Sequence, residues 1–123
     1  MYRTLLKSKI HRAVVTGADV NYEGSLTVDS TLLEAAGMRE FELVQVADVE
    51  NGERLETYLM AGPAGSGIIQ GNGAAARLIH PGDHIIIMVF TQVPEPLPEK
   101  WTPTIVLVDK KNRVREIRSG QKG

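Results

Sequence analysis

The sequence predicts a mainly β protein whose short strands close into a barrel. Its apolar residues come in short runs rich in Val, Ile and Leu, and Gly, Pro, Asn and Asp separate these runs. Only one segment has the pattern of a convincing helix. Because many short strands would leave unpaired edges in an open sheet, a closed barrel is the expected architecture. A chain of 123 residues is long enough for one such domain and too short for two ordinary ones.

The apolar runs predict seven strands. They cover residues 3–15, 24–28, 42–49, 55–61, 67–70, 84–91 and 104–108. The Asn51-Gly52 pair predicts a tight hairpin turn, and the Pro-Gly-Asp sequence at 81–83 predicts a turn before the sixth strand. Three prolines without a backbone donor fall within residues 93–98, so we expect a surface connection there rather than a central strand.

One helix is predicted at residues 31–36. Its first four residues, Thr-Leu-Leu-Glu, fit a capping box, and Gly37 suits the left-handed conformation that ends many helices. A second, shorter helix is expected to start at Asn72. The polar residues 118–123 are expected to be a disordered tail, which leaves residues 1–117 as a single barrel domain.

Composition and charge disfavour several classes of function. Lys and Arg total 14 against 15 Asp and Glu, and aromatic residues make up 5%. The chain therefore has neither the excess positive charge that attracts phosphates nor the aromatic side chains that stack on bases, which disfavours nucleic-acid binding. Cysteine is absent, which removes disulfides and thiolate chemistry. Lys7 and Lys9 interrupt any apolar run that a signal peptide would need, and residues 85–90 are far shorter than the roughly 20 residues of a membrane-spanning helix. We therefore expect a cytoplasmic protein that binds neither nucleic acid nor membrane.

Metal and nucleotide sites are also not expected. His80 and His84 are four residues apart, but the Pro-Gly pair between them prevents the helix that would align both rings on a metal. The glycine-rich segments at 65–67 and 71–73 lack the lysine and the following helix of a nucleotide phosphate loop.

The segment Tyr22-Glu23-Gly24-Ser25 allows two interpretations. A Gly-Ser pair is most often a simple turn. Alternatively, the Ser25 hydroxyl attacks the Gly24 carbonyl, the acyl group moves from nitrogen to oxygen, and elimination with hydrolysis leaves a pyruvoyl group. Gly24 suits this chemistry because it has no Cβ to shield its carbonyl, and strain held by the fold can drive an amide toward the ester.

This segment resembles the self-processing site of bacterial aspartate 1-decarboxylases, and further matches follow in order. The matching residues are Lys9-Ile10-His11, Asn51-Gly52, Arg54, Thr57-Tyr58, the run from Asn72 to Arg77, Gly82-Asp83 and Trp101. The similarity covers nearly the whole chain apart from the polar tail, with spacings intact. It implies a double-psi β-barrel that assembles as a homotetramer, with active sites between neighbouring subunits.

The resemblance also implies a cofactor and a reaction. The chain would cleave itself between Gly24 and Ser25, and the pyruvoyl group made from Ser25 would be its cofactor. Neither a metal nor pyridoxal phosphate would then be needed. The pyruvoyl carbonyl would form an imine with L-aspartate, so that the α-carboxylate leaves as carbon dioxide and β-alanine is released for pantothenate and coenzyme A biosynthesis. Whether cleavage needs an activating partner protein stays open.

Residue roles follow from the same resemblance. Arg54 would grip a substrate carboxylate, and Tyr58 would donate a proton because a phenol, with a pKa of about 10, stays protonated at neutral pH. Thr57 would assist cleavage near the Gly24 carbonyl, and Tyr22 would form a hydrogen bond at the processing loop. A solvated arginine and ordinary strand aromatics are the alternatives. In a regular strand Arg54 and Tyr58 share one face and Thr57 the other, so Thr57 must reach the loop from another side or another subunit.

Two further groups are expected near the substrate. Lys9 and His11 share a strand face and would tune the local charge, with a solvated sheet edge as the alternative. Asn72 would cap the short helix, so that the backbone N–H groups of the next residues face an anion, with plain capping as the alternative. These next residues are Gly73, Ala74 and Ala75.

Two other functions stay open. One is a pyruvoyl decarboxylase for another amino acid, since one arginine does not fix the length of the substrate. The other is a barrel-shaped binding module that is never cleaved and contacts nucleic acid, which the near-neutral charge disfavours.

Overall fold

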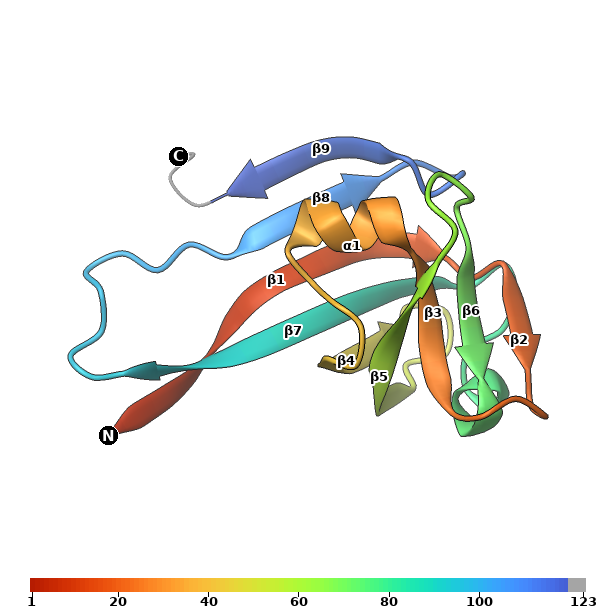
Figure 1. Ribbon diagram of the computed structural model, residues 1–123, viewed down its shortest axis with the longest axis horizontal. Coiled ribbons are helices and arrows are strands. Elements are labelled where there is room, and N and C mark those ends of the chain that lie inside the picture. Colours follow the sequence, from red (N-terminus) through yellow and green to blue (C-terminus); the bar gives the residue numbers. More distant parts are fainter. Residues whose placement is uncertain (120–123) are drawn as a thin grey trace.

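The computed structural model describes residues 1–119, which form one strongly curled sheet with two short helices (Figure 1). The strands are β1 (Tyr2–Val14), β2 (Gly17–Asp19), β3 (Ser25–Asp29), β4 (Leu43–Asp48), β5 (Arg54–Gly62), β6 (Ile69–Asn72), β7 (His84–Pro94), β8 (Thr104–Val108) and β9 (Val114–Ser119). The helices are α1 (Ser30–Ala36) and the 3-10 helix η1 (Gly73–Arg77). The predicted mainly β class is confirmed, and the curl is consistent with the predicted barrel.

Most strands pair with strands that are distant in the sequence. The order across the sheet is β2-β6-β3-β5-β4-β7-β1-β8-β9. The long strands β1 and β7 run antiparallel side by side, whereas β1 with β8 and β3 with β5 are parallel pairs (Figure 1). Only β4–β5 and β8–β9 are hairpins of consecutive strands within the described chain. Such pairings depend on contacts between the two ends of the chain.

One hydrophobic core fills the curl of the sheet. Side chains alternate along the strands, so that Ile10 on β1 and Ile87 on β7 are fully buried while the residues beside them are partly exposed. Leu32 and Leu33 bring the apolar face of α1 onto this core. Burying one such side chain contributes about 1.5–3 kcal/mol, and this burial holds the strands in register.

The predicted helix forms, but its expected N-cap is wrong. The helix begins at Ser30, and the Asp29 carboxylate accepts the Thr31 N–H at 2.8 Å, so Thr31 is not the capping residue. Asp29 takes this role because it is buried and also accepts the N–H groups of Gly65 and Gly67. The end of the helix at Gly37 is confirmed, with φ of 69°.

Other expectations about turns and strand ends have mixed outcomes. The hairpin turn is confirmed, with Gly52 at φ of 77°, and so is the turn before β7, where the Asp83 N–H donates to His80. The expected connection at 93–98 begins later, because Pro94 still pairs with Tyr2 at the end of β7, where a missing donor is tolerated.

Two strands were not predicted. β2 is only three residues long, and all six residues of β9 are exposed, so neither carries an apolar alternation. β9 includes Arg118 and Ser119, which corrects the expected disorder there, and residues 120–123 of that tail lie outside the described residues. No helix between residues 1 and 119 is long and apolar enough to cross a membrane.

Candidate active site

Ser25 is the first residue of β3 and is held by a buried amide. Only 2% of Ser25 is exposed, and the antiparallel register of β3 and β6 places it opposite Asn72. The Asn72 Nδ2 donates to Ser25 Oγ and to Thr27 Oγ1, both at 2.9 Å. Gln70 donates in turn to Asn72 Oδ1 at 2.9 Å, which fixes the orientation of the amide. The Ser25 hydroxyl oxygen is therefore held in one position next to its own peptide bond.

A cavity of about 130 Å³ lies beside that peptide bond and is lined by two of the predicted processing residues, Gly24 and Thr57. Thr57 reaches it from β5 of the same chain, so no second subunit is needed to bring Thr57 to Gly24. The residues that line the cavity are Gly24, Leu55, Glu56, Thr57, Asn72, Ala74, Ala75 and Leu78. A Cβ added to Gly24 would meet no atom within 4 Å, so the position that a side chain would take at residue 24 is open.

Gly73 is the glycine that this site requires on steric grounds. Its φ is 65°, and a Cβ added there would lie 2.8 Å from the Gly24 Cα and 3.0 Å from the Tyr22 carbonyl oxygen. The backbone of η1 is therefore packed directly against the Gly24 peptide. Gly73 was visible in the sequence as part of a glycine-rich segment at the start of the expected short helix, but the contact that makes it necessary was not.

Two predicted roles change with this geometry. Asn72 precedes η1 but makes no capping hydrogen bond, because the β3–β6 register directs its amide to Ser25. Tyr22 is 59% exposed, and its backbone carbonyl rather than its phenol lies against Gly73. Within the described residues its phenol makes no hydrogen bond, so the predicted contact at the processing loop does not form in a single chain.

The other predicted substrate residues lie on the outer face of the sheet. Arg54 and Tyr58 are exposed and alternate along β5 with Thr57, as expected for a regular strand. Since Leu26 of β3 is opposite Leu59 in the core, the residues before them, Ser25 and Tyr58, adjoin on this outer face. The Tyr58 ring stacks on Phe41, with centroids 6.3 Å apart.

Lys9 and His11 lie on the same outer face but farther across the sheet. Both are half-buried and alternate with fully buried Ile10. Cross-strand pairs connect Lys9 through β7 and β4 to Glu56, which lies between Arg54 and Tyr58 on β5. β1 has neighbours on both sides, β7 and β8, so the alternative of a solvated sheet edge is wrong.

The surroundings of His11 are cationic and poorly hydrated. Burial lowers the pKa of the imidazole, and the positive charges of Lys9, Arg12 and Arg118 lower it further. Its Nδ1 is buried without a hydrogen-bond partner among residues 1–119. The ring is therefore neutral at pH 7. Arg118 was not expected near His11, because Arg118 lies on β9 and no apolar alternation predicts that strand.

Comparisons with known proteins show that this small mainly β chain is an enzyme of the decarboxylase class. The model of the aspartate decarboxylase family matches residues 1–115, and the chain belongs to that family. Aspartate 1-decarboxylase of Clostridium beijerinckii is 51% identical over 117 residues, and that of Clostridium botulinum 52%, each covering 95% of this chain and 94% of the relative. Aspartate 1-decarboxylase of Moorella thermoacetica is 48% identical over 121 residues, covering 98% and 94%.

Proposed function

We propose that this chain cleaves itself between Gly24 and Ser25, and that the pyruvoyl group made from Ser25 serves in the decarboxylation of L-aspartate to β-alanine. Membership of the aspartate decarboxylase family supports the decarboxylation. The observation that carries the proposed cofactor is the buried Ser25 hydroxyl, which Asn72 orients at the residue that directly follows Gly24. The residues therefore fit a group that is made from the chain itself and needs no metal or pyridoxal phosphate.

The cleavage uses atoms that already lie together. Ser25 Oγ bonds to the Gly24 carbonyl carbon, the C–N bond breaks, and the hydroxyl proton passes to the freed amine. Elimination then removes the Ser25 Cα proton and releases the Gly24 carboxylate, which leaves an enamine at residue 25. The enamine becomes an imine, and water hydrolyses this imine to the pyruvoyl ketone and ammonia. Thr57 lines the cavity at Gly24, where it can donate a hydrogen bond to the oxygen that becomes negative.

The side chains of the outer face supply binding and proton transfer. When present, the pyruvoyl carbonyl acts as an electron sink for the bond that breaks, as pyridoxal phosphate does elsewhere. Arg54 binds a substrate carboxylate through its planar guanidinium, and Lys9 adds positive charge beside a neutral His11. Tyr58 adjoins Ser25 and gives a proton to the carbon that loses carbon dioxide. Ala74 and Ala75 border the cavity at Gly24, beside which the pyruvoyl group would form.

We propose a homotetramer whose active sites lie between neighbouring subunits. Lys9 on β1 is four strands from Ser25 on β3, a path of about 19 Å along the curled sheet at the usual strand spacing, which favours a site built from more than one copy. A groove that includes Leu43 and Phe90 lies on the outer face, and both side chains are exposed although they are apolar. Such a patch is typical of a subunit interface. The product would supply pantothenate and coenzyme A biosynthesis in the cytoplasm.

The first test is the intact mass of the denatured protein, measured with and without a carbonyl-reactive reagent. We expect two fragments that meet at Gly24-Ser25, with the larger fragment carrying the reactive carbonyl. A single uncut chain that stays uncut after incubation with cell extract would instead support the uncleaved binding module. Cleavage in extract alone would identify a requirement for an activating protein.

The chain offers a matched control for the cleavage, since a second Gly-Ser pair occurs at Gly65-Ser66. Ser66 is exposed, and its hydroxyl donates to the Pro63 carbonyl at 2.6 Å. Ser25→Ala should leave an uncut, folded and inactive chain, whereas Ser66→Ala should be cleaved and active. Decarboxylation by Ser25→Ala would refute the pyruvoyl assignment, and a preference for an amino acid other than aspartate would favour the related decarboxylase.

A further inference from the structure

Asp48, the last residue of β4, has a carboxylate that is only half satisfied. It is 2% exposed, and its Oδ1 accepts the N–H groups of Glu50 at 2.9 Å and Asn51 at 3.3 Å. Its Oδ2 has no hydrogen-bond partner among residues 1–119. An ionised oxygen that is buried without a hydrogen-bond donor raises the free energy of the folded state, so the form of Asp48 with a proton on Oδ2 is favoured.

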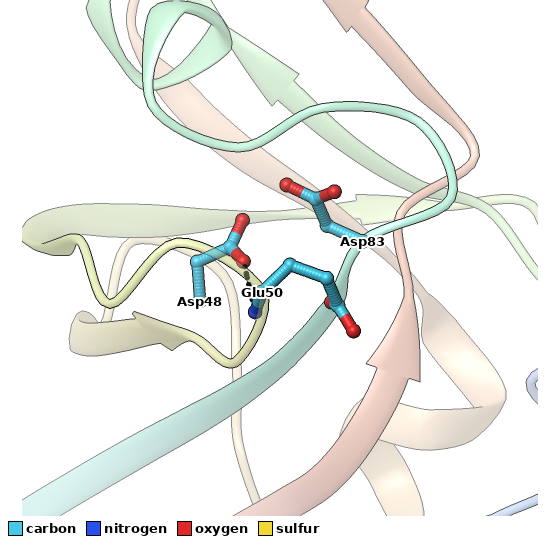
Figure 2. Close-up of side chains that lie close together, drawn as sticks. All are labelled: Asp48, Glu50 and Asp83. Carbon is cyan, nitrogen blue, oxygen red and sulfur yellow. Dashed lines mark hydrogen bonds between the residues drawn. The ribbon is translucent and has the colours of Figure 1, made fainter.

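Asp83 supplies the partner for that proton. Figure 2 shows the carboxyl groups of Asp48 and Asp83 turned toward each other across the gap between the β4–β5 hairpin and the turn before β7. Their oxygens lie within 4.8 Å of one another. The Asp83 carboxylate accepts the His80 N–H at 3.1 Å, which favours the negative charge on Asp83 rather than on Asp48.

We infer that Asp48 and Asp83 share one proton, and that this shared proton ties the hairpin that precedes Arg54 to the turn that precedes β7. Burial raises the pKa of Asp48, and the contact with Asp83 raises it further. The same contact lowers the pKa of Asp83. Opposite shifts of two adjoining carboxyl groups are expected when one proton serves both.

The third carboxylate of the cluster is engaged elsewhere. Glu50 turns away from the pair in Figure 2, and its two oxygens face the backbone N–H and the Nδ1 of His84. His80 faces Asp83, with 3.6 Å between Nδ1 and Oδ2. Glu50, His80 and His84 are thus the titratable groups packed around the pair. One oxygen of Glu50 lies within 4.8 Å of an oxygen of each aspartate, but both Glu50 oxygens already face donors of His84, so the shared proton involves the two aspartates.

The tied segments border the cavity at Gly24. Asn51 of the hairpin donates to the Leu78 carbonyl at 3.0 Å, and Leu78 and Leu55 both line the cavity. Arg54 follows the hairpin directly, so the start of β5 moves with it. Asp48 and Asp83 are therefore positioning residues for Arg54, a role that rests on the proposed function, whereas the shared proton itself does not.

The test compares thermal unfolding across pH for the purified wild-type chain and three variants, Asp48→Asn, Asp83→Asn and Asp109→Asn. An asparagine has the shape of the protonated acid and keeps a donor at every pH. Asp109 is the matched control, because this exposed aspartate accepts the N–H groups of Lys111 and Arg113 in a turn without a second carboxyl group. All proteins are compared at one concentration and one heating rate.

The direction of the effect follows from the raised pKa of Asp48. A carboxyl group with a raised folded-state pKa adds stability that is complete below its unfolded pKa of about 3.9 and is lost as the pH rises through the folded-state value. Measured against Asp48→Asn, the wild-type melting temperature should therefore fall by several degrees as the pH rises above about 4. Asp48→Asn and Asp83→Asn should both flatten this fall, and Asp109→Asn should keep it.

Two results would overturn the shared proton. Parallel profiles for the wild type and Asp48→Asn would mean that no proton is held there. A profile that flattens in Asp48→Asn but not in Asp83→Asn would mean that burial alone holds the proton on Asp48.

Positioning is read separately from the KM for L-aspartate. With rising pH, KM should increase severalfold more in the wild type than in Asp48→Asn, because only the wild type loses the tie beside Arg54. Equal increases would overturn the positioning role. A chain without any decarboxylase activity would overturn the proposed function instead, and the unfolding profiles would still report on the proton.

Discussion

Asn72 shows how one buried amide can specify a reactive group. Its side chain makes three hydrogen bonds, two as donor to the hydroxyl oxygens of Ser25 and Thr27 and one as acceptor from Gln70. Ser25 is buried, and Thr27 and Gln70 are partly buried, so an apolar residue at 72 would leave the Ser25 hydroxyl without this partner. The amide therefore does two things at once, because it joins β3 to β6 and aligns the oxygen that is proposed to attack Gly24.

Gly73 is predicted to be as important for cleavage as the residues that react. Gly73→Ala places a Cβ against the Gly24 backbone and holds alanine at a φ of 65°. We expect a loss of about 2–4 kcal/mol in the free energy of unfolding, together with slower cleavage, because the Gly24 peptide must move away from Ser25 Oγ. Urea unfolding measures the first effect, and intact mass over time measures the second.

The variant Gly65→Ala distinguishes the backbone strain of a positive φ from the close contact that Gly73 makes with Gly24. Gly65 has a φ of 77°, but a Cβ there would meet no atom within 4 Å. This variant should lose about 1 kcal/mol and be cleaved at the normal rate. If Gly73→Ala behaves in the same way as Gly65→Ala, the close approach to Gly24 has no influence on the site.

The residues of the site were predictable by type, but their partners were not. Ser25 and Thr57 were expected beside the scissile peptide. Thr57 does line the cavity at Gly24, and Asn72, which also lines it, holds the Ser25 hydroxyl. The expected helix cap by Asn72 was wrong, and the Asp48–Asp83 pair was unforeseen. In each case the partner is set by how two strands or turns distant in the sequence align, and no local pattern encodes that alignment.

At the scale of elements, Asp29 joins three segments of the chain. It ends β3, caps α1 through Thr31, and accepts the N–H groups of Gly65 and Gly67 from the turn after β5. Its burial would raise the pKa of the carboxyl group, but these N–H groups outweigh that effect and lower it. The carboxylate therefore stays charged and holds the helix against the sheet.

Asp29→Asn is predicted to destabilise the folded chain by about 1–3 kcal/mol at neutral pH, because the amide keeps one acceptor oxygen and turns a donor toward the remaining N–H groups. A lowered folded-state pKa adds stability that is complete above the unfolded pKa of about 3.9 and is lost as the pH falls through the folded value. The wild type should thus lose stability in acid more steeply than Asp29→Asn. Urea unfolding at neutral and acidic pH tests both parts.

Elements with a strong local pattern were predictable, and elements held by their neighbours were not. β7 combines an apolar run with a preceding turn, and its position was expected. β9 is exposed along its whole length and exists because β8 offers it an unpaired edge. β2 is likewise held by pairing with β6. Strands of this kind take their order from hydrogen bonding to an existing edge rather than from burial.

At the scale of the whole molecule, the curled sheet separates two sets of groups. Gly24 and Thr57 border one cavity within a single chain. On the outer face, Arg54 is about 14 Å from Ser25 if four residues of β5 and one strand spacing separate them, and Lys9 is farther still. The proposed cleavage therefore needs only groups of one chain, whereas the proposed substrate site would draw on side chains from a second copy.

This separation predicts complementation between two inactive variants. Ser25→Ala lacks the cofactor but keeps Arg54, and Arg54→Ala forms the cofactor but lacks the carboxylate clamp. If a site combines Ser25 of one chain with Arg54 of a neighbour, random assembly of the two variants makes about a quarter of the sites complete. Co-expression should therefore restore about that share of decarboxylase activity, measured as β-alanine released by the purified mixed assembly.

Thr57→Ala is the matched control, because Thr57 lies three residues from Arg54 on the same strand but faces the cavity of its own chain. Co-expression of Ser25→Ala with Thr57→Ala should restore nothing, since the chain that keeps Ser25 also lacks the threonine beside its own Gly24. Restoration in both mixtures would mean that Thr57 acts across subunits. Restoration in neither would mean that Arg54 serves Ser25 of its own chain, and that the outer face binds substrate without help from a second copy.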